Sequence, residues 1–226
     1  MPPSTSGALD PAWGVVASRE HRWPATLAVA AAVALTVALP DPLFLGPRWV
    51  LPAVEAALAA PLLVVSPFRH RDEPPVTRWM SLALIGLAEV ANLISLSLLV
   101  QAIINGSNIG GHQLILAAVE IYLTNVLLFG LWFWELDRGG PGARMCIDHR
   151  EPDFLFPQMV TPDSAPKAWN PNFVDYLYVA FTNATAFSPT DTMPLTRAAK
   201  TLMTLESAAA LLTVTLVAAR AVNILK

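Results

Sequence analysis

The sequence predicts an all-α membrane protein with about five transmembrane helices and one re-entrant segment. Of its 226 residues, 54% are hydrophobic and 14% are charged, whereas about 25% of the residues in an average soluble domain are charged. Only two formally charged residues, Glu89 and Glu120, lie between positions 81 and 134. Because a span needs about 20 predominantly apolar residues, that stretch alone can hold two helices.

Composition divides the chain into four regions. These are an N-terminal tail (1–22), a four-helix transmembrane region (23–136), an extramembrane loop (137–172) and a region with the re-entrant helix and the final span (173–226). Within the second region we expect spans at about 23–39, 49–66, 78–104 and 112–134.

The first span has an alternative interpretation, since its apolar run could be the core of a signal peptide. No clean small-residue cleavage site ends the run and further spans follow it, so we favour a span. The second span contains Pro52 and Pro61, which a membrane helix tolerates where neighbouring helices satisfy the freed carbonyl groups. The fourth ends in Leu-Trp-Phe-Trp, typical of the aromatic belt at the membrane boundary. We therefore expect Glu135, Asp137 and Arg138 to lie in water.

The segment 173–187, FVDYLYVAFTNATAF, is apolar enough to enter a membrane but short and polar for a span. We expect it to be re-entrant, and such a segment must be shielded by protein or line a water-filled cavity. The alternative is an amphipathic helix lying in the interface. The final span, about 194–224, begins at Pro194, and the start of a helix tolerates proline.

The arrangement from Asp175 to Leu225 resembles the pore-loop and inner-helix region of potassium channels. The matching features are an aromatic pore-helix string, a turn that ends in Asp, and a proline, a basic residue and a glutamate leading into the inner helix: Tyr178–Phe181, Asp191, Pro194, Lys200 and Glu206. The TVGYG filter, whose backbone carbonyls coordinate the ion, is missing. The five residues before Asp191 are Ala-Phe-Ser-Pro-Thr and contain no glycine.

This resemblance implies a degenerate pore loop that lines or plugs a polar vestibule. The expected vestibule residues are Asn183, Thr185, Ser188, Pro189, Thr190 and Asp191. The strings WELDRGGP, FSPTD and RAVNIL also resemble an uncharacterised family of bacterial polytopic inner-membrane proteins, the conserved hypothetical type, and this likeness implies no activity.

Glutamates within predicted spans form the second candidate site. There is one on each of the last four spans: Glu55, Glu89, Glu120 and Glu206. A charge at mid-bilayer costs on the order of 3 kcal/mol on insertion scales, which makes such a group a functional candidate. Asn92 follows Glu89 by three residues, and Thr124 follows Glu120 by four. These groups could converge on a proton or small-cation site, or they could only form hydrogen bonds between helices.

Other chemistry has little support in the sequence. The four histidines are scattered, GxSxG, HExxH and Walker motifs are absent, and the single cysteine, Cys146, excludes an intrachain disulfide. We expect no enzyme activity, no cofactor and no metal centre. A net charge of −3 without a basic run gives no support to a nucleic-acid partner.

Two function classes stay open. The first is an ion-channel-like or transporter-like protein in a bacterial inner membrane, whose partners are the lipid bilayer, a small cation or proton and other copies of the chain. A shared pore would require a homo-oligomer, for example a tetramer. The second is a non-conducting scaffold that binds a partner through the 137–172 loop.

The distribution of basic residues predicts the orientation. If the 173–187 segment only dips into the membrane, three of the 14 basic residues lie on one side, Arg48, Arg220 and Lys226, and the other eleven lie opposite. The positive-inside rule then places the long loop in the cytoplasm, whereas pore-loop channels carry theirs outside.

Overall fold

The computed structural model describes residues 23–44, 47, 49–50, 52–54, 75–105, 109–145, 151–161, 169–185 and 191–224. Most of the predicted 49–66 span, together with Glu55, Ser188, Pro189 and Thr190, lies outside the described residues. The longer helices are α1 (Trp23–Ala38), α3 (Pro75–Asn105), α4 (Gly111–Leu136), α6 (Phe173–Thr185) and α7 (Arg197–Ile224). The shorter elements are η1 (Asp41–Leu43), η2 (Asp137–Gly139), η3 (Ala143–Met145), β1 (Phe154–Leu155), α5 (Pro157–Val160) and β2 (Met193–Pro194).

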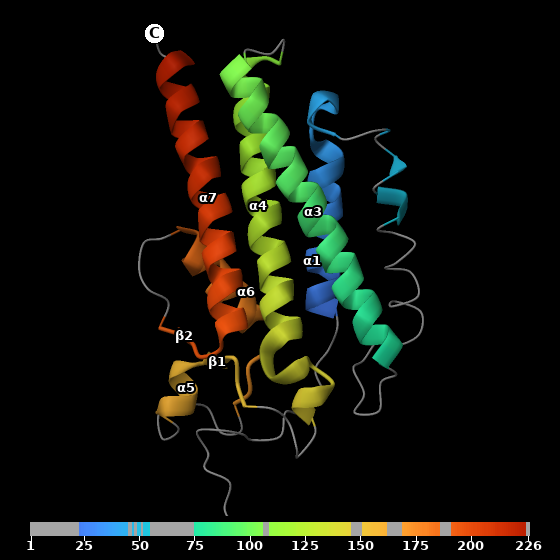
Figure 1. Ribbon diagram of the computed structural model, residues 1–226, viewed down its shortest axis with the longest axis vertical. Coiled ribbons are helices and arrows are strands. Elements are labelled where there is room, and N and C mark those ends of the chain that lie inside the picture. Colours follow the sequence, from blue (N-terminus) through green and yellow to red (C-terminus); the bar gives the residue numbers. More distant parts are fainter. Residues whose placement is uncertain are drawn as a thin grey trace, which may run out of the picture.

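Helix α4 lies at the centre of the bundle and contacts α1, α3, α6 and α7 (Figure 1). Its sequence, GHQLILAAVEIYLTNVLLFGLWFWEL, is apolar on most of its circumference, and a helix that is apolar on all sides is normally buried. Accordingly, most of its second half is covered, including Phe129, Leu131 and Phe133. The sequence of α4 thus explains its central position.

Three helical segments are long and apolar enough to cross a membrane: Val76–Asn105, Gly111–Met145 and Arg197–Arg220. They correspond to the predicted spans at 78–104, 112–134 and 194–224. Helix α1 is apolar but has only 16 residues, or about 24 Å at 1.5 Å per residue. The all-α class expected from the sequence is therefore confirmed, and three helices have the length and apolarity expected of membrane spans.

The final span begins later than Pro194, because that residue belongs to a short antiparallel pair of strands. Phe154 in β1 faces Pro194 in β2, and the Leu195 N–H donates to the Asp153 carbonyl at 2.8 Å. Helix α7 starts at Arg197, where the Thr196 hydroxyl accepts a hydrogen bond from the Ala199 N–H at 3.2 Å. A threonine that accepts in this way is a helix N-cap, so the cap sets the start of the helix.

The charged residues in the last turn of α4 and directly after it do not lie in water. Glu135 and Asp137 are 0% exposed and Arg138 is 1% exposed, which makes the sequence-based expectation for them wrong. The segment that follows returns over the end of α4, and β1, α5 and the start of α6 gather there in Figure 1. Charges at a helix end can be buried when each finds partners, and these partners come from chain segments far away in sequence.

Candidate functional site

The first part of the site joins the end of α6 to α7. The Asn183 side-chain amide donates to Glu206 Oε2 at 2.6 Å and to the Met203 carbonyl at 2.8 Å. The Ser207 hydroxyl donates back to the Asn183 carbonyl at 3.3 Å. Glu206 is 0% exposed. The last turn of α6 is thereby fixed to the interior face of α7.

Local sequence signals explain why α6 begins and ends where it does. At its start, the Asn172 side chain accepts from the Val174 N–H at 2.9 Å, and the Asp175 carboxylate accepts from the Asn172 N–H at 2.8 Å. This reciprocal pattern is a capping box. At its end, carbonyl groups have no intrahelical donor, and the Thr185 hydroxyl donates to the Thr182 carbonyl at 3.1 Å. The helix is 13 residues long, so it reaches only part of the length of α4.

Glu89 of α3 faces this junction. It is 8% exposed and lies close enough to Glu206 for the two carboxyl groups to interact electrostatically. From α4, Tyr122 also interacts electrostatically with Glu206, and the Asn125 side-chain amide donates to the Glu206 backbone carbonyl at 3.4 Å. Four helices, α3, α4, α6 and α7, therefore meet around one pair of buried carboxyl groups.

Several oxygen atoms at this junction have no hydrogen-bond partner among the described residues. They are Glu89 Oε1 and Oε2, Glu206 Oε1 and Asn125 Oδ1. A buried polar group left without a partner costs roughly 1–3 kcal/mol, and more if it is charged. No lysine or arginine occurs between Arg78 and Arg138 in the sequence to supply a positive charge. The arrangement of acceptors suits a proton or a small cation.

The backbone adds to this preference for positive charge. The C-terminal end of an α-helix carries a partial negative charge, equivalent to about half an elementary charge, and the end of α6 is where Asn183 contacts Glu206. Within the described ranges, no group of three or more His, Cys, Asp or Glu side chains could hold a metal ion. The junction is therefore built from two carboxyl groups, amides and hydroxyls, and not from a cluster of strong metal ligands.

The sequence-predicted residues divide into those the structure brings together and those it does not. Asn183 bonds to Glu206, Glu89 interacts electrostatically with Glu206, and Asn92, 5% exposed, lies one turn from Glu89 on α3. Glu120 is only partly buried and lines a separate cavity. The others lie in varied surroundings: Thr124 is buried on α4, Thr185 is partly buried at the end of α6, and Asp191 is exposed.

Sequence reasoning did not identify three groups at the junction, Tyr122, Asn125 and Ser207. Asn125 had a signal, because it follows Thr124 directly inside an otherwise apolar run. Ser207 and Tyr122 had none, since a hydroxyl on an apolar helix can equally bond to its own backbone.

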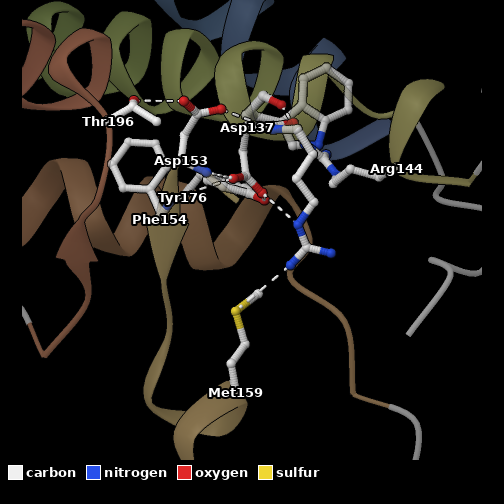
Figure 2. Close-up of polar contacts among 9 residues, drawn as sticks. Asp137, Arg144, Asp153, Phe154, Met159, Tyr176 and Thr196 are labelled. Atoms are coloured by element: carbon white, nitrogen blue, oxygen red, sulfur yellow. Dashed lines mark hydrogen bonds and ion pairs between the residues drawn. The ribbon is translucent and has the colours of Figure 1, made fainter. Parts of the chain in front are cut away.

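A second buried polar network, which the sequence did not predict, holds the lower end of the bundle in Figure 1 together (Figure 2). Asp137 is its centre. Its Oδ1 accepts from the backbone N–H groups of Asp153 and Phe154 at 2.8 and 3.4 Å, and its Oδ2 accepts from the Tyr176 hydroxyl at 2.6 Å. Arg138 Nε lies 3.6 Å from the same Oδ2.

Two further side chains extend this network. Arg144 Nη1 donates to the carbonyls of Trp134 and Asp137 at 2.8 and 3.1 Å, and its guanidinium lies 5.1 Å from the centre of the Tyr176 ring. Asp153 accepts from the Thr196 hydroxyl at 2.6 Å, which ties the network to the start of α7. The groups of this network bond to one another, so we assign the network a structural role: it fixes the positions of α4, α6 and α7 relative to one another.

Comparison of the chain with protein-family models, with curated proteins and with solved structures gave no match.

Proposed function

We propose that this chain is an ion-channel-like or transporter-like membrane protein in which Glu89 and Glu206 form an intramembrane site for a small cation or a proton. The observation that carries the proposal is that two buried carboxyl groups from different helices lie within range of electrostatic interaction, with no basic residue between Arg78 and Arg138. Intramembrane carboxyl groups are costly and commonly mark ion or proton pathways.

The proposed topology has five spans and one re-entrant helix in a bacterial inner membrane. Its support is the position of α6, which is 13 residues long and packs against α4 and α7. Its end, at Asn183, contacts α7 nine residues after that helix begins, a rise of about 14 Å at 1.5 Å per residue. A helix that ends near mid-membrane needs protein or water around its terminal carbonyls, and the polar junction supplies such groups.

Oligomerisation is part of this proposal. The outer face of α6 carries an apolar row at helical spacing, Val174, Tyr178 and Phe181, which are 61%, 57% and 51% exposed. A half-membrane helix is favoured where protein covers it, and a second copy of the chain would do so. One pore loop per chain also needs several copies around a shared axis. A purified protein that is strictly monomeric would argue against the shared-pore version.

Ion flux in proteoliposomes tests the proposed site. We expect cation or proton flux in the wild type, and a decrease of about tenfold or more in Glu89→Gln and in Glu206→Gln, because each substitution replaces a carboxyl group that can release its proton with an amide that cannot. Tenfold corresponds to about 1.4 kcal/mol of lost binding free energy. Glu151→Gln is the matched control, since it makes the same chemical change at an exposed position outside the helices. Sodium, potassium and pH gradients would be imposed in separate runs.

The absence of flux under all three gradients would contradict this proposal and favour the non-conducting scaffold. Equal flux in wild type, Glu89→Gln and Glu206→Gln would leave conduction in place but remove the two carboxyl groups from the pathway.

A further inference from the structure

Residues near the start of α4 line a cavity of about 780 Å³. In Figure 1, this end of α4 is opposite the end that leads into the Asp137 network. Leu39, Leu116 and Ala117 form part of the apolar wall of the cavity, and its polar groups are Asp41, Gln113 and Glu120. Among the described residues that line it, none is basic. The cavity is large compared with the roughly 30 Å³ that one water molecule occupies in the liquid.

A line of buried polar side chains leads from this cavity toward Glu89. On α3, Ser95, Asn92 and Glu89 follow one another at intervals of three residues and are 5%, 5% and 8% exposed. The Ser95 hydroxyl donates to the carbonyl of Leu43 at 3.0 Å. Leu43 ends η1, the turn whose first two residues line the cavity. The line therefore begins beside the cavity and ends at the proposed cation site.

Helix α4 contributes another polar side chain between the cavity and Glu89. Thr124 lies one turn after Glu120 along α4 and is 3% exposed. The Asn92 side-chain amide nitrogen has no hydrogen-bond partner among the described residues, and neither has either carboxyl oxygen of Glu89. Buried amides and carboxyl groups without partners, arranged at successive turns, are the groups that water or a passing ion would satisfy.

We propose that this cavity is a cation-selective aqueous vestibule, through which small cations reach Glu89 from the membrane side on which α4 begins. The proposal rests on the carboxyl site described under the proposed function. Glu120, with one carboxyl oxygen buried and without a hydrogen-bond partner in the described part of the chain, sets the selectivity by attracting cations and repelling anions. Asn92 and Ser95 line the passage beyond it.

Cysteine accessibility tests the vestibule without requiring transport. In a Cys146→Ala background the chain carries no thiol, and single cysteines are placed at Gln113, which lines the cavity, and at Asn92, which lies beyond it. The probes are a trimethylammonium methanethiosulfonate and a sulfonate methanethiosulfonate, applied to right-side-out and inside-out vesicles separately. Val90→Cys, on the exposed apolar face next to Glu89, and Thr213→Cys, buried on α7, are the controls.

We expect Gln113→Cys and Asn92→Cys to react from one face of the membrane only, with the cationic reagent about tenfold faster than the anionic one. Adding Glu120→Gln should bring that ratio close to one. Both control cysteines should remain unmodified. If Asn92→Cys fails to fold, Ser95→Cys is the smaller change at the next position of the same line.

Three results would overturn the vestibule: no reaction at either test position, reaction from both faces, or equal rates for the two reagents. Labelling and flux separate the two proposals. If labelling follows the expected pattern but Glu89→Gln does not change the flux, the vestibule is supported and the carboxyl site is contradicted. If Glu89→Gln reduces the flux but the labelling pattern is not the expected one, the carboxyl site is supported and the vestibule is contradicted.

Discussion

Asp137 explains, at the scale of single residues, how charged groups become buried at the end of a membrane helix. Its two carboxyl oxygens accept hydrogen bonds from Asp153, Phe154 and Tyr176, and Arg138 lies beside one of them. A buried charge is tolerated when hydrogen bonds and a counter-charge surround it, and removing one partner is costly. The chain reaches this arrangement through backbone conformations at positive φ, 54° at Arg138.

Removing the Tyr176 hydroxyl is the first test of this network. We expect Tyr176→Phe to lower the free energy of unfolding by about 1.5–3 kcal/mol, the usual value of a hydrogen bond to a charged group, because Asp137 Oδ2 loses its donor at 2.6 Å. Thermal or denaturant unfolding in detergent measures the change. Tyr178→Phe removes the same hydroxyl from an exposed residue of the same helix, and it should leave the stability almost unchanged. Equal effects of the two substitutions would contradict the role of the network.

The pH dependence of stability provides a second test of the role of the Tyr176 hydroxyl. Burial raises the pKa of Tyr176 well above its ordinary value of 10.0. Because the folded-state pKa is above the unfolded one, this contribution to stability is complete below about pH 10 and is lost as pH rises beyond it. Tyr176→Phe should therefore weaken the alkaline loss of stability, and Tyr178→Phe should not.

At the scale of elements, the position of α6 depends on a close approach to α4. A Cβ atom on Gly130 would lie 3.2 Å from the backbone Cα of Leu177 in α6, so an alanine there requires α4 and α6 to separate by a few tenths of an ångström. At Gly86 on α3, an added Cβ would meet the Trp132 ring at 3.7 Å, an ordinary contact. The two glycines therefore make a matched pair.

We expect Gly130→Ala to displace α6, to lower stability by about 1–3 kcal/mol as overpacking commonly does, and to reduce ion flux, because Asn183 would move away from Glu206. Gly86→Ala should have little effect on either quantity. Unfolding and proteoliposome flux would be measured on both variants. If the Gly130→Ala protein had wild-type stability, α4 and α6 could separate to admit the methyl group without any loss of stability, which would contradict this prediction.

At the scale of the whole molecule, the side of the membrane that carries the 137–172 loop is open to a direct test. Cys146, the only cysteine of the chain, belongs to this loop in the sequence and lies outside the described residues. The distribution of basic residues predicts a cytoplasmic loop. We therefore expect a membrane-impermeant maleimide to label Cys146 only after cell lysis. Labelling of intact cells would reverse the orientation and agree with that of pore-loop channels.

The fold was predictable where it depends on the length and apolarity of a single helix. Spans at 78–104 and 112–134 correspond closely to α3 and α4, because both length and apolarity are local properties. The start of α7 was misplaced by three residues, since Pro194 pairs with Phe154, which is 40 positions away. Glu135, Asp137 and Arg138 were expected in water for a similar reason. The hydrogen-bond partners of Asp137 are Asp153, Phe154 and Tyr176, which lie at distant positions that no local pattern indicates.

The sequence by itself determined that the chain has helices long and apolar enough to span a membrane and that carboxyl groups lie within them, because hydrophobicity and span length are local properties of the chain. Only the tertiary structure decided which of these carboxyl groups meet. Helical spacing fixes the face on which Glu89, Glu120 and Glu206 lie, but not the neighbour that each face receives. Packing of α3, α4, α6 and α7 brings Glu89 to Glu206 and leaves Glu120 at a separate cavity.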